Sequence, residues 1–338
     1  MKEIVTPLLS WYKENKRDLE WRKHPTPYHV LVSEIMLQQT RVETVRPYYH
    51  RFINELPDFQ SLALCKEERL LKLWEGLGYY SRVRNLKKCA MEIMEKHQGS
   101  FPKNYEQAIK LPGVGMYTCG AVLSIAYHQK YAAVDGNVLR VLTRYMASSM
   151  DISLEKTKQY FKKELEKIMP TDAGAFNQSL MELGATICMP KVVLCDACPI
   201  KMNCMARQEN TQLKYPMKPL PKEKKILEYT LLFITDGQKY VLIPKKEGVL
   251  KGLPSPILID SYLSSNEAID YTSSLGFHPL REIRLPDKTH TFTHQKWYMK
   301  GYKIIVDHLL DYPAFELEEI KNRLGIPTCF KQFINDLD

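Results

Sequence analysis

The chain has 338 residues, of which 44% are hydrophobic and 26% are charged, an ordinary balance for a globular protein. This length predicts two or more domains, and the formal net charge of +9 favours a polyanionic partner without requiring one. No signal peptide is recognisable in Met1–Lys16, and the longest apolar stretch, Val114–Tyr127, is too short to span a bilayer. We therefore expect a cytoplasmic protein that has no membrane association and keeps its eight cysteines reduced.

The first two hundred residues are predicted to form a helical body with short connections. Apolar residues recur with the period of an α-helix in seven segments, which are Ile4–Tyr12, Tyr28–Leu37, Leu62–Trp74, Leu86–Ile93, Met116–Tyr127, Val138–Met146 and Phe176–Leu183. Prolines stand where several of these helices would begin or end.

Two acidic residues of this body are candidate catalytic groups. Glu34 lies in the string SEIMLQQT, and Asp135 lies in VDGN, which ends at Asn137. Taken singly, an acid in a helix is usually solvated, and an aspartate before a helix is usually an N-cap. Composition and spacing alone do not decide between these structural roles and catalysis.

A glycine-rich turn separates two of the predicted helices. Leu111–Gly115 reads LPGVG, in which Gly113 and Gly115 permit positive φ and leave backbone N–H groups uncovered. The following helix begins at Met116, so its N-terminal dipole adds to these donors and makes a site suited to a DNA phosphate. An ordinary helix–turn–helix corner is the alternative.

Four cysteines lie close together after the last predicted helix of the body. Cys188, Cys195, Cys198 and Cys204 are spaced C-x6-C-x2-C-x5-C, so four thiolates could surround one soft-metal centre. Zinc sites usually contain two tight cysteine pairs, and only one is present here, so an iron–sulfur cluster fits better. A zinc knot, disulfides and unlinked buried thiols remain the alternatives.

The composition changes after these cysteines. Residues 210–225 are rich in proline and lysine and predict an extended basic linker. Strands are predicted at Tyr229–Thr235, Lys239–Ile243 and Tyr298–Val306, and helices at Glu267–Leu275 and Leu317–Leu324. The C-terminal third is therefore expected to be a separate α+β domain.

Several of these strings occur together in one known family. SEIMLQQT, GLGYYSR (residues 76–82), LPGVGxYT, VDGNVxR and the cysteine loop resemble, in the same order, those of the MutY branch of the endonuclease III superfamily of DNA glycosylases. The resemblance covers most of residues 15–205. It implies a mostly α fold, with a helical glycosylase domain over 1–209. That domain would contain a helix-hairpin-helix at about 104–127 and a [4Fe–4S] loop at 188–204.

The resemblance also implies an activity. Glu34 would protonate adenine at N7, Asp135 would stabilise or trap the sugar cation, and Asn137 would orient these groups. Tyr117 stands where bifunctional relatives carry the lysine that forms a Schiff base. A monofunctional glycosylase is therefore implied.

Other residues are assigned DNA contacts by the same resemblance. Gln39 and Tyr79 would enter the base stack, with Thr40 and Leu77 beside them. The string RDLEWR resembles the family's RDLPWR, with Glu20 in place of proline. The remaining residues assigned to the adenine pocket are Arg17, Trp21, Arg22 and Gln178.

The C-terminal domain, residues 226–338, is expected to resemble the Nudix fold and to read the base opposite adenine. Phe292, Thr293 and His294 resemble the family's F-S-H motif, with threonine in place of serine. Residues 252–256 read GLPSP and depart from the usual GLWEFP. No acidic Nudix-box helix is evident, so hydrolase activity is not expected in this domain.

The implied substrate is double-stranded DNA holding adenine opposite 8-oxoguanine or guanine, and a monomer suffices for this chemistry. A pyrimidine-damage or T·G mismatch glycosylase of the same fold is one alternative, and Tyr117, Gln178 and the C-terminal domain argue against it. A non-catalytic iron–sulfur DNA-binding protein is another, against which the presence of both Glu34 and Asp135 argues.

Overall fold

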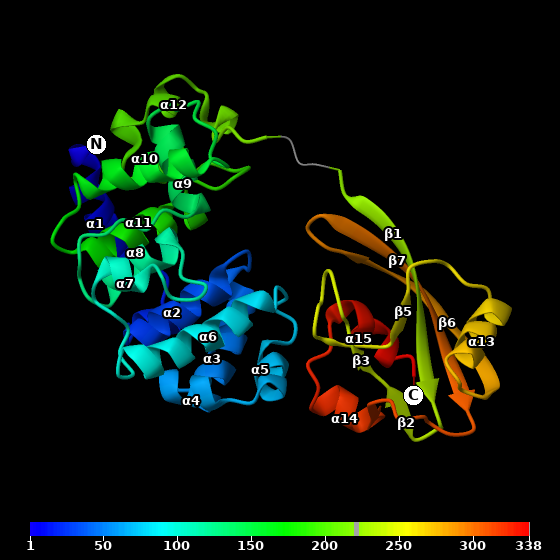
Figure 1. The fold of residues 1–338 in the computed structure, drawn as a ribbon. Coiled ribbons are helices and arrows are strands. Elements are labelled where there is room, and N and C mark those ends of the chain that lie inside the picture. The colour runs from blue at the N-terminus through cyan, green and yellow to red at the C-terminus, as the bar shows by residue number, and fades with distance from the viewer. Residues whose placement is uncertain (220–222, 338) are drawn as a thin grey trace. The chain divides into compact units, whose positions relative to one another are not determined.

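A computed structural model describes residues 1–219 and 223–337. It divides into two compact units. The helical unit comprises Met1–Leu64 and Asn85–Leu220, and the sheet unit comprises Cys65–Arg84 and Pro221–Asp338 (Figure 1).

The helical unit confirms the prediction of a helical body. Its α-helices are α1 (Val5–Asn15), α2 (Pro27–Leu37), α3 (Val42–Glu55), α4 (Phe59–Leu64), most of α6 (Ser81–Lys96), α7 (Tyr105–Ala108), α8 (Met116–Ile125), α9 (Gly136–Tyr145), α10 (Glu155–Glu166), α11 (Ala173–Thr186) and α12 (Met205–Gln208). Short 3₁₀ helices add η2 (Glu20–Arg22) before α2, and η3 (Cys195–Ala197), η4 (Lys201–Asn203) and η5 (Gln212–Lys214) after α11.

Three of the helices at the candidate site, α2, α9 and α11, begin at side-chain caps. Thr26 accepts a hydrogen bond from the His29 N–H and precedes Pro27 at the first position of α2. Asp135 caps α9 in the same way, and Asp172 caps α11. The apolar faces of α9, α10 and α11 pack together into one buried core, which includes Leu142, Phe161, Phe176 and Leu180.

The sheet unit contains a mixed sheet. Strand β1 (Lys225–Thr235) pairs in parallel with β7 (Gln295–Val306), and β6 (Pro279–Thr291) pairs antiparallel with β7. The order is β6-β7-β1-β2-β8, with β2 (Lys239–Val241) and β8 (Ala314–Glu316), while β5 (Ile257–Ile259) pairs with β1. Strands β3 (Ile243–Pro244) and β4 (Pro254–Ser255) form a separate pair.

Helices cover both faces of this sheet (Figure 1). Alternate side chains of β1 belong to opposite faces of the sheet, because successive strand side chains point in opposite directions. Leu231 and Phe233 pack with α14 (Leu317–Asn322) and α15 (Thr328–Ile334), whereas Leu232 and Ile234 pack with α13 (Ser265–Ser274).

Several elements were not predicted from the sequence, among them the helices α3 and α10, and three further differences have a physical reason. The predicted helix Leu62–Trp74 is two helices, α4 and α5 (Glu67–Trp74), because Lys66 is extended. Strand β6 was not predicted, since its sequence is charged, contains proline and shifts register between Leu285 and Lys288. The proposed linker is not extended throughout: the carbonyl of Tyr215 accepts a 3.0 Å bond from Nε of Arg144, so its first part is held on α9.

Within the described residues, every helix is too short or too polar to act as a membrane span.

Candidate active site

A cavity of about 1460 Å³ opens in the helical unit between α2, α8, α9 and α11. Twelve of the residues singled out in the sequence line it, namely Arg17, Trp21, Arg22, Glu34, Gln39, Thr40, Gly113, Gly115, Tyr117, Asp135, Asn137 and Gln178. The folded chain thus brings together groups from four separate motifs.

The carboxyl group of Glu34 is buried on α2, with 7% of the residue exposed. The hydroxyl of Tyr117, from α8, donates a short hydrogen bond to Oε2 of Glu34. Burial raises the pKa of Glu34 to about 7, and the charge of Asp135 raises it as well, while the Tyr117 bond lowers it. Glu34 is therefore partly protonated near neutral pH and can serve as a proton donor in this cavity.

Asp135 is held by its own N-cap geometry. Oδ1 accepts a 2.7 Å bond from the Val138 N–H, and Oδ2 accepts a 2.8 Å bond from the side-chain amide of Asn137. Burial raises the pKa of Asp135, and these donors oppose the rise by stabilising the carboxylate. The predicted N-cap role and a place at the cavity therefore belong to the same side chain.

Arg140 connects this cap to the cysteine loop. Its NH2 group donates to Oδ1 of Asn137 at 2.9 Å and to the carbonyl of Gly184 at 2.6 Å, and its Nε donates to the carbonyl of Cys188 at 2.8 Å. A buried arginine with these acceptors fixes α9, α11 and the loop together.

Glu182 is a cavity residue that the sequence reasoning missed. It lies on α11, 1% exposed, and accepts bonds from Arg17 Nε at 2.6 Å and Arg22 NH2 at 2.7 Å. Burial works to raise the pKa of Glu182, but the two arginines outweigh it and the net shift is downward. The available signal was its spacing of four residues from Gln178, which places both on one helix face.

The hairpin and the end of α2 form the exposed rim. Gly113 has φ +76° and lies against Asn85, so a Cβ there would come within 2.9 Å of the Asn85 Cβ. Gly115 caps α8. Gln39 is exposed with φ 58°, followed by the half-buried Thr40. These residues present backbone and polar groups to solvent.

The four cysteines are free thiols in one loop. Cys188, Cys198 and Cys204 pack against the helical core, and Sγ of Cys188 accepts a 3.3 Å bond from Arg144. Burial chiefly raises the pKa of Cys198 to about 12, with smaller upward contributions from the other three thiols. Among the described residues, no three His, Cys, Asp or Glu side chains are arranged as a metal-binding group.

The remaining predicted residues lie in the sheet unit. Leu77 is buried and Tyr79 is 48% exposed with φ 49°. The Tyr79 hydroxyl is hydrogen-bonded to that of Thr293, in the exposed turn between β6 and β7. Phe292 packs on the Trp297 ring at 4.8 Å, and His294 is exposed.

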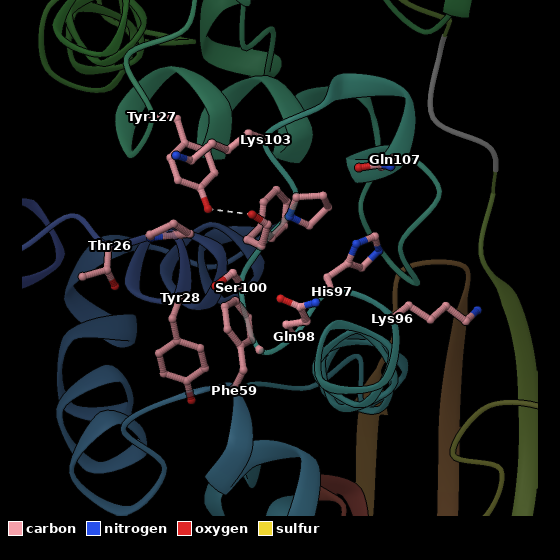
Figure 2. Close-up of a pocket in the computed structure, with 14 residues that line it drawn as sticks. Thr26, Tyr28, Phe59, Lys96, His97, Gln98, Ser100, Lys103, Gln107 and Tyr127 are labelled. Carbon is pink, nitrogen blue, oxygen red and sulfur yellow. Dashed lines mark hydrogen bonds between the residues drawn. The ribbon is translucent and has the colours of Figure 1, made fainter.

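A second, smaller cavity of about 660 Å³ lies beside the N-terminus of α2 (Figure 2). Tyr28, Phe59, His97 and Lys103 are among its lining residues, and the Tyr127 hydroxyl donates to the carbonyl of Phe101 at 2.6 Å. None of the predicted site residues lines it.

Comparisons of the sequence and the fold with known proteins identify relatives of this chain. Residues 32–170 match the HhH-GPD superfamily of base excision DNA repair proteins. The adenine DNA glycosylase of Buchnera aphidicola subsp. Schizaphis graminum is 42% identical over 229 residues, covering 67% of this chain and 65% of that protein. That of subsp. Baizongia pistaciae is 32% identical over 311 residues, covering 89% and 86%. A solved structure of a thermostable thymine-DNA glycosylase aligns with a TM-score of 0.57 and 30% identity, covering 62% of this chain and 96% of that one.

The fold is therefore that of an HhH-GPD protein, a helical domain that is followed here by a mixed β-sheet region. The aligned part of the chain spans just under two thirds of the length of the first of these relatives. The chain belongs to the adenine DNA glycosylase family, MutY.

Proposed function

We propose that this protein is a monofunctional DNA glycosylase, acting as a monomer, that removes adenine mispaired with 8-oxoguanine or guanine in base excision repair. One observation carries the proposal above the others. Glu34, a buried carboxyl group whose pKa is raised to about 7, lines the same cavity as Asp135, which is held by N–H donors.

The chemistry follows from this pair. Neutral adenine leaves a sugar poorly, and protonation at N7 by Glu34 makes it a better leaving group. Once the proton has moved, the Tyr117 hydroxyl stabilises the remaining Glu34 carboxylate by donating to Oε2. Glu34 can then act as the base that activates water.

Asp135 supplies the second role. As the N-glycosidic bond breaks, positive charge develops on the sugar, and an ionised Asp135 stabilises or captures it. The Asn137 amide and the Val138 N–H keep this carboxylate oriented. Two carboxyl groups with different environments thus divide acid and anionic roles between them.

The target base must leave the duplex to reach these groups. Arg17, Trp21, Arg22 and Gln178 would surround the extruded adenine, with Glu182 fixing both arginines. Glycines 113 and 115 would hold the backbone phosphate. Tyr117 has no amine with which to attack the abasic sugar, so strand cleavage is not expected.

We further propose that Cys188, Cys195, Cys198 and Cys204 hold a [4Fe–4S] cluster. Four free thiols in one loop provide an all-sulfur donor set, and their ionised forms repel one another until a cationic centre is bound. The cluster would stabilise the loop that Arg140 joins to α9. Purified protein should contain iron and sulfide in equal amounts, whereas zinc alone would support a zinc knot.

We assign the C-terminal region, residues 226–338, to a Nudix-like domain that reads the opposite base, with residues 210–225 as its connection to the glycosylase domain over 1–209. In this assignment the lesion would be faced by Phe292, Thr293 and His294. The disrupted base stack would be contacted by Gln39, Thr40, Leu77 and Tyr79. The exposure of Thr293 and its bond to Tyr79 support this assignment.

One assay tests the activity. Duplexes containing A·8-oxoguanine, A·G, T·G or thymine glycol, labelled on each strand in turn, are incubated with the protein and treated with alkali. Breaks confined to the adenine strand are expected. Cleavage at thymine would favour the alternative to which the thymine-DNA glycosylase structure points, and binding without base release would indicate a non-catalytic protein.

A further inference from the structure

The three successive side chains of the short helix η2 contact two different helices, α3 and α11. Glu20 contacts α3, Trp21 lines the cavity and packs edge-on against Tyr49 of α3 at 5.3 Å, and Arg22 donates to Glu182 of α11. The helix is therefore held from both sides, and Trp21 stands between the two attachments.

The attachment to α3 is ionic. Oε1 of Glu20 lies 2.6 Å from NH2 and 3.2 Å from Nε of Arg46, and 3.3 Å from Nε2 of His50. Arg46, Tyr49 and His50 have the spacing that puts them on one face of a helix. Glu20 and Trp21 thus contact one side of α3.

The geometry makes Glu20 depend on Arg46. The Glu20 side chain is only 18% exposed, and its Oε2 is buried without a hydrogen-bond partner in the part of the chain that the structure describes. The bond from Arg46 is the main reason that the pKa of Glu20 is lowered to about 2. Removal of Arg46 would leave a largely buried carboxylate poorly compensated.

We propose that Glu20 and Arg46 form a positioning pair, which holds Trp21 and Arg22 at the cavity wall and so contributes to binding of the extruded base. The proposal rests on the function proposed above. Neither residue of the pair touches the base, since neither lines the cavity. The pair acts through η2.

Proline offers a second way to fix this helix. Leu19 is extended, with φ −122° and ψ 135°, which is the conformation that a following proline requires. Residue 20 is the first of η2, where proline is well tolerated. Glu20→Pro is therefore expected to keep η2 in place without the ion pair.

The test compares binding to two duplexes. One holds 2′-fluoro-2′-deoxyadenosine opposite 8-oxoguanine, because the fluorine slows base loss, and the other holds an abasic analogue at the same position. Glu20→Gln and Arg46→Gln should weaken binding of the first duplex by about two- to fivefold, as expected for a partly exposed ion pair. In Glu20→Gln, binding of the abasic duplex should not weaken. Arg46→Gln also removes a positive charge, so for this variant the loss on the adenosine duplex should exceed the loss on the abasic duplex.

Three further variants sharpen the test. Glu20→Arg combined with Arg46→Glu should restore affinity for the adenosine duplex, and so should Glu20→Pro in an Arg46→Gln background. Glu92→Gln breaks the 3.1 Å surface ion pair with Lys96 and makes the same charge change as Glu20→Gln. As the matched control, it should not weaken binding of either duplex. Loss of a negative charge alone would tighten DNA binding, which makes a selective loss diagnostic.

The outcomes separate the two proposals. The positioning role would be overturned if the variants lost affinity equally for both duplexes, or if Glu20→Gln bound the adenosine duplex as tightly as the wild type. Wild-type protein that binds but releases no adenine would instead overturn the proposed function. Thermal midpoints of all variants show whether a loss arises from unfolding.

Discussion

The hydroxyl of Tyr117 donates a hydrogen bond to Oε2 of Glu34, a residue 83 positions earlier in the sequence. Burial is the main cause that raises the pKa of this carboxyl group, to about 7, and the bond from Tyr117 is the largest effect that opposes the rise. A proton donor is most useful when its pKa lies near the working pH. The Tyr117 hydroxyl therefore tunes the group on which base release is proposed to depend.

Replacement of Tyr117 by phenylalanine should shift the pH profile of adenine release. In the proposed mechanism Glu34 acts in its protonated form, so the single-turnover rate should fall as the pH rises through its pKa. Without the Tyr117 bond the pKa of Glu34 is higher, and this falling limb should move to higher pH. Tyr127→Phe removes a hydroxyl outside the large cavity and should leave the profile unchanged. An unshifted limb in Tyr117→Phe would contradict the coupling.

Glu34→Gln should alter stability in a pH-dependent way. The folded pKa of Glu34, about 7, exceeds its ordinary value of 4.5, so the folded state binds the proton more tightly than the unfolded state. The stability that the protonated Glu34 contributes to the folded state is fully present below pH 4.5 and is lost as the pH rises through 7. At pH 8 the variant should gain up to about 3 kcal/mol of unfolding free energy over the wild type. Denaturant titrations at pH 5 and pH 8 measure the difference, and equal effects at both would contradict it.

Gly184→Ala should damage the active site through packing alone. A Cβ at this position of α11 would lie 2.7 Å from Cβ of Asn137 and 3.1 Å from its backbone, where little can yield. We expect a loss of about 1–3 kcal/mol in unfolding free energy, together with slower base release as Asn137 is displaced from Asp135. Gly136→Ala is the matched control, because a Cβ there meets nothing within 4 Å. Similar behaviour of the two variants would refute the packing argument.

Thr293→Val should reduce discrimination between 8-oxoguanine and guanine. The substitution keeps the shape of the side chain but removes the hydroxyl that is bonded to Tyr79. The loss of one hydrogen bond corresponds to about a two- to tenfold change. Thr293→Ser retains the hydroxyl and serves as control. The ratio of single-turnover rates on A·8-oxoguanine and A·G measures the effect, and an unchanged ratio in Thr293→Val would argue against a lesion-reading role.

Most helices of the body and the strands β1 and β7 could be predicted from the sequence because their apolar periods are strong, but α3 and α10 were missed. Strand β6 could not, since charges and proline interrupt its alternation. The docking of the segment around Tyr215 was also invisible, because it depends on a buried arginine that satisfies backbone carbonyls from far along the chain.

The candidate site divides in the same way. Motifs identified Glu34 and Asp135, but no local pattern revealed that Tyr117 would bond to Glu34. Glu182 was missed because an acid in a helix is ordinarily solvated. Its importance appears only when Arg17 and Arg22 converge on it from another element.

The most direct test of the account compares wild-type protein and Glu34→Gln under single-turnover conditions with an A·8-oxoguanine duplex, alongside affinity for the 2′-fluoro analogue. The account predicts similar affinities, adenine release by the wild type and no detectable release by the variant. Release at the wild-type rate from Glu34→Gln would show that the proton comes from elsewhere and would contradict the central claim.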